Sequence, residues 1–588
     1  MSIENLKHTR AIEELLKLKT SSYNVQKSYF FVLIIYILFS SEMFCQNLHL
    51  NVTGKTITET EVIDSIGYAK SHENYLSVKN EIDSLRKQFN TIGYIENRLI
   101  GIKKKNDSVF TANIHLNKKF NTIYIYYNKF DIDETLLNSI SEEIHADYFT
   151  INISNAATTL NYLNTELANN GYPFSKLKLS NIEKKDKNNL KANLIIVSNA
   201  EKRTIDDIKI VGYEKFPKSY LKHYLKLKKN QVFDLATIKD KTEQLNNLRF
   251  ANQLKPPEVL FQKDSTSLYI YVEKSMSNTF DGFLGFGTND ETNKLEFDGF
   301  LNLRLVNNLN FGETFGLLYK SDENDQDTFD ASLTLPYLFS SPIGVDLSLR
   351  IFKKDSSFTT IDQKAKINYQ INTLHKVSTG ISSVESNNLR ASNTMVSLQD
   401  YNSNYVTVSY EYLKPQYVDL LFPIKSNFYL ETNFGNRKTD EKKTKQSLIS
   451  LRAFNSFNLN RKNSIYINAD ASNLTSKNYF DNELLRFGGI NSIRGFEENS
   501  LFASLFGVLN TEYRYRLSNS IYLHSITDVA YFENKSANIK EKLFGYGFGF
   551  GILTNSGLLK FNYANGKNEN QKFKLSNSKI HLSLTANF

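Results

Sequence analysis

The pattern of hydrophobic and polar positions changes once along the chain, near residue 280. Before that point, short alternating runs are followed by apolar residues that recur every three or four positions, as in amphipathic strands and helices. After it, segments of roughly ten residues alternate apolar with polar positions up to the C-terminus, which is the pattern of membrane-spanning strands. We therefore expect an α+β N-terminal half and an all-β C-terminal half.

The N-terminal half repeats one plan, and its first unit shows the plan most clearly. An alternating strand begins at Leu48, and a later helix ends at Gly93-Tyr94, because glycine adopts the left-handed C-cap conformation. Two strands, Arg98–Lys104 and Val109–Leu116, close the unit. The helix carries an apolar stripe at spacings of three and four: Val78, Ile82, Leu85, Phe89 and Ile92.

Two further units follow the same order of strand, helix, helix, strand and strand. The second unit opens with Phe120–Tyr127 and ends its long helix at Gly171-Tyr172. The third opens with Ile205–Val211, but Arg249-Phe250 replaces the Gly-Tyr end, so its match is looser. These boundaries predict three modules, at residues 47–118, 119–199 and 200–275.

Residues 280–588 are predicted to form a transmembrane β-barrel of about 16 antiparallel strands, at about 9–11 residues for each spanning strand. The last segment, Ile580–Phe588, places its apolar residues on one face and its polar residues on the other. In the run 545–551 glycine alternates with aromatic residues, so we expect glycine inside and aromatic rings toward lipid. A soluble all-β protein would also alternate, but it rarely does so with 42 Phe, 34 Tyr and only 8 Pro.

Residues 1–46 are predicted to be a signal-peptide region. Lys27 precedes an apolar run, residues 29–41, that is short for a spanning helix and suits a secretion signal. Cleavage is expected near Cys45-Gln46, with lipid modification of Cys45 as the alternative. No other stretch is apolar for about 18 residues, so membrane insertion of the mature chain has to use strands.

Composition and motifs argue against several functional classes. The formal charge of +9 is modest and interspersed, which predicts a solvated surface without nucleic-acid binding. The single Cys excludes a disulfide framework and a cysteine-based zinc site. The nine His form no metal-binding spacing, and no Ser-His-Asp order stands out. We therefore expect no enzyme activity, no metal and no cofactor.

Longer polar connections between the predicted strands are expected on the extracellular side of the barrel. They are Asp322–Asp327, Glu385–Asn404, Arg437–Lys445 and Lys477–Asn499.

Two features together resemble a known family. The repeated units resemble POTRA domains, and Ser492-Ile493-Arg494-Gly495-Phe496 resembles the lid-loop motif of the BamA/TamA superfamily of outer-membrane assembly and translocation proteins. The motif falls between the eleventh and twelfth predicted strands, where that family carries its lid loop. Three modules resemble the TamA arrangement more than the five-module assembly protein. The resemblance covers essentially the whole mature chain.

The resemblance implies specific residues for the lid. Arg494, Gly495 and Phe496 would form the motif that folds back into the lumen. Glu512 and Asp528, on the two following strands, would be the lumenal partners of Arg494, and the planar donors of arginine suit carboxylates. The alternative is that Arg494 is a solvated loop residue and Glu512 an ordinary lumenal charge.

The family's working part is a weak seam between its first and last strands, which the resemblance carries over to this chain. The seam would lie between Phe588 at the C-terminus and Gly282, Phe283, Gly285 and Gly287 in the first strand, where the glycines weaken strand pairing. The implied partners are unfolded outer-membrane or surface client proteins, outer-membrane lipids and a periplasmic or inner-membrane protein that binds the modules. The terminal strand also resembles the signal by which the assembly machinery selects its clients.

These features predict a cell-outer-membrane protein with its modules in the periplasm, which inserts or exports β-rich clients through that lateral gate. A two-partner secretion transporter is the first alternative, although such proteins typically have two modules and a plug helix. A passive porin or receptor barrel is the second, and it would need neither the modules nor the lid motif.

Overall fold

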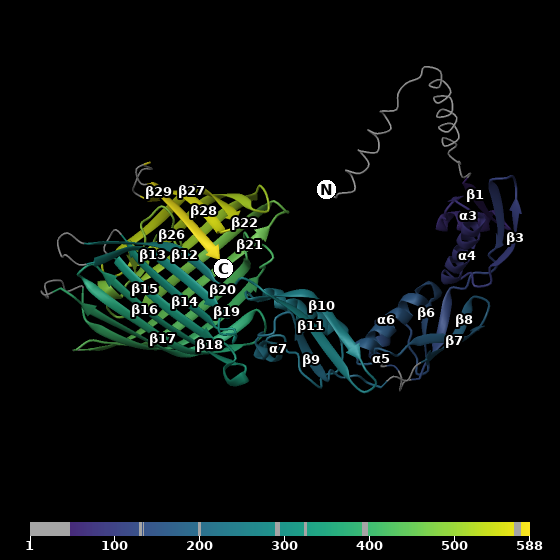
Figure 1. Cartoon of the computed structure of the whole chain (residues 1–588), viewed down its shortest axis with the longest axis horizontal. Coiled ribbons are helices and arrows are strands. Elements are labelled where there is room, and N and C mark those ends of the chain that lie inside the picture. The colour runs from purple at the N-terminus through teal and green to yellow at the C-terminus, as the bar shows by residue number, and fades with distance from the viewer. Residues whose placement is uncertain are drawn as a thin grey trace, which may run out of the picture. The chain divides into compact units, whose positions relative to one another are not determined.

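The computed structural model describes residues 47–128, 132, 134–197, 201–288, 295–322, 326–390, 398–440, 442–569, 575 and 578–588. The predicted signal region, residues 1–46 with Cys45, lies outside the described residues. The chain divides into two compact units, which are described separately (Figure 1). The first comprises Met1–Glu166 and Phe174–Asn199, and the second comprises Leu167–Pro173 and Ala200–Phe588.

The first module has its own four-stranded sheet, in the order β2-β1-β4-β3, covered by two helices. Buried residues of the predicted stripe on the long helix, from Val78 to Phe89, pack against Leu50 and Val52 of the sheet. Asn74 caps that helix by accepting a hydrogen bond from the backbone N–H of Ser77. The elements are β1 (Leu48–Gly54), α3 (Ile57–Ile66), β2 (Ser71–His72), α4 (Tyr75–Thr91), β3 (Arg98–Lys104) and β4 (Val109–His115).

The second module repeats this topology, with its sheet in the order β6-β5-β8-β7. In both modules the first strand pairs in parallel with the last. The short edge strands β2 and β6, each between two helices, are absent from the predicted plan. The elements are β5 (Thr122–Tyr126), α5 (Glu134–Leu137), β6 (Tyr148–Asn152), η1 (Ile153–Asn155), α6 (Ala156–Asn169), β7 (Leu177–Lys184) and β8 (Asn189–Ile196).

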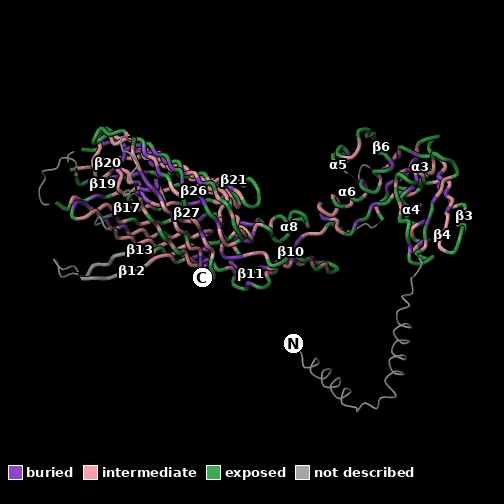
Figure 2. The backbone as a smooth tube through the Cα atoms, turned by 90° about the horizontal axis from the view of Figure 1, so that it is seen from above, coloured by how far each residue is buried: buried purple, intermediate pink, exposed green. Residues whose placement is uncertain are grey.

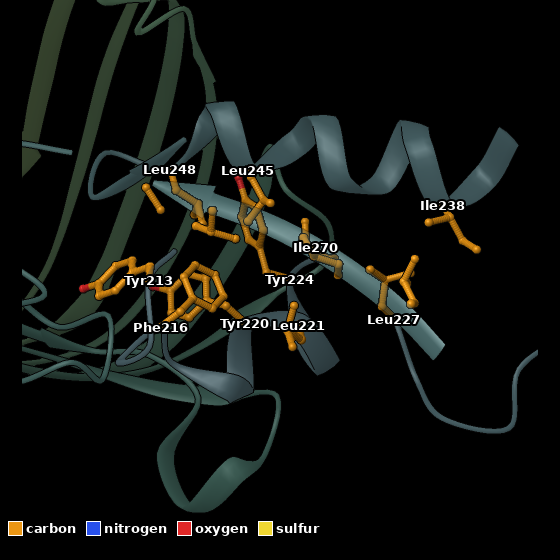
Figure 3. Close-up of a cluster of buried hydrophobic side chains, with 14 of the residues drawn as sticks. Tyr213, Phe216, Tyr220, Leu221, Tyr224, Leu227, Ile238, Leu245, Leu248 and Ile270 are labelled. Carbon is orange, nitrogen blue, oxygen red and sulfur yellow. The ribbon is translucent and has the colours of Figure 1, made fainter. Parts of the chain in front are cut away.

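The third module has a three-stranded sheet, β10-β11-β9, and belongs to the same compact unit as the barrel. Its apolar core is rich in aromatic residues, and Figure 3 shows Phe216, Tyr220 and Tyr224 gathered below Leu245 and Leu248. The predicted order of strand, helix, helix, strand and strand is confirmed. The elements are β9 (Asp207–Val211), α7 (Lys218–His223), α8 (Leu235–Glu243), η2 (Gln244–Asn247), β10 (Ala251–Phe261) and β11 (Thr266–Lys274).

The C-terminal half is a closed antiparallel barrel of sixteen strands, as predicted. Each strand pairs with its neighbour along the chain, and the first pairs with the last. The strands are β12 (Thr279–Thr288), β13 (Leu295–Val306), β14 (Thr314–Asp322), β15 (Gln326–Leu335), β16 (Ile343–Lys354), β17 (Phe358–Gln370), β18 (His375–Asn388), β19 (Tyr401–Pro415), β20 (Ile424–Lys438), β21 (Lys443–Asn458), β22 (Asn463–Thr475), β25 (Leu505–Arg516), β26 (Ile521–Asn534), β27 (Ile539–Thr554), β28 (Gly557–Asn568) and β29 (Ser578–Asn587).

Three of the predicted long connections are shorter than the sequence suggested, and one of them is Asp322–Asp327, since β15 begins at Gln326. Strand β18 continues to Asn388 and β19 begins at Tyr401, while β20 continues to Lys438 and β21 begins at Lys443. The pairing continues there although the residues are polar on both faces, as in Lys438 opposite Lys443. Polar residues therefore mark where the strands leave the apolar band, not where they end.

Burial changes from residue to residue along the barrel strands, as the alternating pattern predicts (Figure 2). On β27 the rings of Tyr546 and Phe548 are exposed on the outer face. A Cβ added to Gly549 would lie 2.5 Å from the ring of His524, which is buried on the inner side. On β29 the outward residues are Ile580, Leu582 and Leu584. Within the described residues, no helix is long and apolar enough to cross a membrane.

Candidate functional site: the lid loop in the barrel lumen

The connection between β22 and β25, the eleventh and twelfth barrel strands, folds into the lumen. It contains a short helix, η4 (Asp481–Glu483), and a hairpin of β23 (Leu485–Phe487) and β24 (Leu501–Ala503). At its centre Ile493 is fully buried and Arg494 is 6% exposed. We call residues 476–504 the lid loop.

Arg494 is bound to the barrel wall by a bidentate interaction with Asp528 on β26. Its Nε donates to Asp528 Oδ2 at 2.8 Å and its Nη2 donates to Asp528 Oδ1 at 2.6 Å. The backbone N–H of Arg494 donates to the same carboxylate at 3.0 Å. Asp528 is completely buried, so this charge depends on its partner to offset the cost of desolvation.

Glu512 on β25 completes the ionic cluster. It accepts a hydrogen bond from Nη1 of Arg494 and another, at 2.7 Å, from Nε of Arg514 on its own strand. The structure thus brings Arg494, Glu512 and Asp528 together inside the lumen. Two carboxylates attract one buried guanidinium and so hold the loop in place. They also fix the orientation of the Arg494 side chain, because its planar set of N–H donors fits both carboxylates in only one way.

Glycines allow the loop backbone to lie directly on the wall. Gly495 has φ +92°, and a Cβ there would lie 2.3 Å from the backbone nitrogen of Gly566 on β28. A Cβ on Gly545 of β27 would lie 2.4 Å from the carbonyl oxygen of Arg494. A side chain at Gly495, Gly545 or Gly566 would push the motif away from the wall. Phe496 lies beside them, with its ring 2.8 Å from a Cβ built on Gly566.

An apolar patch in the lumen supports the same loop. Phe487 stacks on Phe506 of β25, with 4.7 Å between ring centroids, and meets Phe532 of β26 edge-on at 5.5 Å. Ile493 is buried in the same cluster, against which Phe496 packs. The lid is therefore held by apolar burial as well as by the ionic cluster.

The seam between β12 and β29 is the shortest of the described barrel pairings. Only Thr279↔Asn587 and Phe280↔Ala586 are in register, and Asn278 and Phe588 exchange backbone hydrogen bonds at 3.1 and 3.0 Å. The other described neighbours in the barrel are registered over eight residue pairs or more.

Gly282, with φ +150°, follows the last paired residues of β12. Beyond it, residues 283–288, which include Phe283, Gly285 and Gly287, pair only with β13. Only the backbone is described there.

Sequence reasoning missed other polar residues that hold the lid loop. Arg437 on β20 binds Glu483 of η4, and Lys579 on β29 binds Glu497 at 3.0 Å. These pairs are 46 and 82 positions apart, and each member looks like a solvated charge in its local sequence. Inward alternation at Arg437 was the only available signal. Among the described residues, no group of three His, Cys, Asp or Glu could hold a metal ion.

Together, the modules, the closed barrel and the lumenal lid define an outer-membrane barrel preceded by POTRA-type modules. The family model "POTRA: Surface antigen variable number repeat" matches residues 203–275. A search of curated proteins by sequence finds no match. The chain thus carries a POTRA domain directly before a closed sixteen-stranded barrel.

Three solved structures are similar to this chain. CdiB from Escherichia coli aligns with a TM-score of 0.50 at 13% identity, over 87% of this chain and 97% of that chain. CdiB from Acinetobacter baumannii gives 0.49 at 14% identity, over 80% and 90%. BamA from Haemophilus ducreyi lacking POTRA domains 1-3 also gives 0.49 at 14% identity, over 79% and 99%.

Proposed function

We propose that this protein inserts β-rich client proteins into the outer membrane through a lateral gate between β12 and β29, without catalytic chemistry. The observation that carries the proposal is the two-residue register of that seam. Residues 578–585 of β29 pair with β28 and have no registered partner on β12. An unpaired strand edge is a template to which a client strand can add.

The paired part of the seam lies at the end of the barrel nearest the third module. From Gly282 onward the two strands separate toward the end where the lid loop leaves β22. The gate would therefore begin to open from that end, and full opening would also part the remaining pairs at Thr279 and Phe280. Because membrane barrels carry their short turns on the periplasmic side, we propose that the modules lie in the periplasm and offer their edge strands to clients.

A disulfide across the seam tests this mechanism. Phe280 and Ala586 are paired in register, and cysteines at facing strand positions lie within the Cα separation that a disulfide needs. We expect oxidised Phe280→Cys/Ala586→Cys to reduce insertion of an outer-membrane client into liposomes to the protein-free level, and reduction to restore it. A matched lock, Leu523→Cys/Phe550→Cys across the fully paired β26 and β27, should leave insertion unchanged. Undiminished insertion by the oxidised seam variant would exclude the lateral gate.

Export through the lumen is the second candidate, because the fold is equally that of CdiB. The same locked protein separates the two mechanisms. A transporter that passes its substrate through the lumen would continue to secrete with the seam closed, whereas a lateral insertase would stop. The lid loop is bound to several strands of the wall and so obstructs the lumen, which favours the insertase.

A further inference from the structure

A second buried arginine holds the lid loop, and this one belongs to the barrel wall and points to the loop. The guanidinium of Arg437, on β20, pairs with the carboxylate of Glu483 in η4, and the two side chains are 2% and 4% exposed. Nη2 of Arg437 donates to Asn478 Oδ1 at 2.7 Å, and Nη1 donates to the Asn478 carbonyl at 3.3 Å. The guanidinium also lies 3.8 Å from the ring centroid of Phe480.

Neighbouring strands complete this contact. Gln446 on β21 donates to the other oxygen of Glu483 at 3.0 Å. Asn482 donates to Ser386 on β18 at 2.9 Å, and its carbonyl accepts from the hydroxyl of Tyr401 on β19 at 3.3 Å. Asn478, Asn482 and Glu483 are therefore each bound by a side chain of β18, β19, β20 or β21.

The polarity of this contact is opposite to that of the Arg494 cluster. At Arg494 the loop supplies the cation and the wall supplies the carboxylates. At Arg437 the wall supplies the cation and the loop supplies the carboxylate. The Arg437 contact lies on β18–β21 and the Arg494 cluster on β25–β28, so the two contacts share no residue.

The middle of the loop reaches a third part of the wall. Arg486 of β23 lies 4.7 Å from the ring of Phe352 on β16 and 5.1 Å from that of Phe358 on β17. Arg486 also lines a polar cavity of about 560 Å³, together with Glu483 and with Lys364 of β17. The loop thus contacts the wall from β16 round to β28 and lines part of this cavity.

We propose that Arg437 and Glu483 form a second anchor of the lid loop, which keeps the lumen closed independently of Arg494. The burial of this pair is the physical reason: separating the two groups leaves a buried charge without its partner, so η4 stays on the wall. Arg437 is a positioning residue, since it acts through the loop. The inference rests on the proposed membrane barrel, but not on its lateral gate.

Conductance of the full-length protein in planar bilayers tests this anchor. We expect Arg437→Leu and Glu483→Gln each to raise the fraction of time spent in a conducting state by about tenfold, since a buried ion pair is broken. Arg452→Leu, which removes another inward arginine on β21, serves as the control and should stay at the wild-type level. The conservative Arg437→Lys should recover part of the closure, because it restores the charge without the planar fork.

A labelling experiment separates lid release from poor folding. Leu484, next to Glu483, is 5% exposed, so a Leu484→Cys reporter should resist a water-soluble maleimide. Adding Arg437→Leu should expose it, while the folded, heat-modifiable fraction alone is scored. If folded Arg437→Leu protein keeps both wild-type conductance and wild-type protection, the second anchor does not exist. The outcome is independent of the seam disulfide, because no client protein is used.

Discussion

At the scale of single residues, buried charge explains why the lid lies where it does. Asp528 is fully buried and binds three donors of one residue, Arg494. A carboxylate this deep in the lumen has no water to replace a lost partner, so the pair is far more sensitive to substitution than an exposed ion pair.

Replacing Asp528 tests this directly. We expect Asp528→Asn to destabilise the folded barrel by about 3–5 kcal/mol, because Arg494 keeps only Glu512 as a charged partner. The midpoint of urea unfolding in detergent, followed by heat-modifiable mobility, measures the change. Asp470→Asn, at another inward carboxylate on β22 that makes no hydrogen bond to the lid, should shift the midpoint much less. Equal shifts for the two variants would contradict a special role for the lid cluster.

At the scale of elements, the stretch after the motif crosses the inner side of the seam. Glu497 pairs with Lys579 on the last strand at 3.0 Å, and Glu498 lies 3.5 Å from Lys320 on β14. Neighbouring loop residues thus bind strands on the two sides of the proposed gate. Both pairs are partly exposed, and such pairs contribute at most about 1 kcal/mol each, which suits a latch that has to release.

A charge exchange tests the latch. Lys579→Glu should repel Glu497 and raise the rate of client insertion, by up to about fivefold for about 1 kcal/mol, with the effect fading at high salt. The double variant Glu497→Lys/Lys579→Glu restores attraction and should return the rate to that of the wild type. If the single variant inserts clients at the wild-type rate at low salt, or if the double variant does not return to that rate, the latch is ruled out.

The sequence predicted elements better than it predicted contacts between them. Strand β3 occupies the predicted residues 98–104, because its alternation and its turn are both local signals. Arg494 could be assigned partners only through a family resemblance together with inward alternation at Glu512. Arg437 had neither aid, since its partner Glu483 lies in a loop whose polar residues resemble any solvated connection. The number of residue pairs across the seam between β12 and β29 could likewise not be predicted from the sequence, because it depends on how the closed barrel places the two strands.

At the scale of the whole molecule, the third module and the barrel form one packed unit. Val306 at the end of β13 and Tyr337 in the turn after β15 are buried in the module's own core. Tyr220 of α7 donates its hydroxyl proton to the Gly312 carbonyl at 3.2 Å and meets the Tyr337 ring edge-on at 4.9 Å. Burial raises the pKa of Tyr220 well above its usual value, so the phenol stays a donor at any physiological pH.

The third module contacts three successive turns at one end of the barrel. Gly312 lies between β13 and β14, Ser340 between β15 and β16, and Ile371 between β17 and β18. His223 Nε2 lies 2.7 Å from the Ser340 carbonyl oxygen, and Lys226 donates to that of Ile371 at 3.1 Å. A module fixed to consecutive turns keeps a constant direction relative to the barrel wall, so that a strand bound on its sheet edge is always presented to the same turns.

Removing the ring of Tyr220 should loosen this joint while leaving the barrel closed. Tyr220→Ala deletes a buried aromatic side chain at a cost of about 3–5 kcal/mol, and we expect faster hydrogen exchange in α7 with unchanged exchange in β19–β21. Tyr269→Ala, on β11 of the same module and outside the buried core, should leave α7 as protected as in the wild type. Client insertion should fall with Tyr220→Ala only, because a loosened module no longer presents a bound client strand to the barrel in a fixed orientation. If α7 exchanges faster but insertion continues at the full rate, the fixed joint contributes stability alone and the modules deliver clients without a defined orientation.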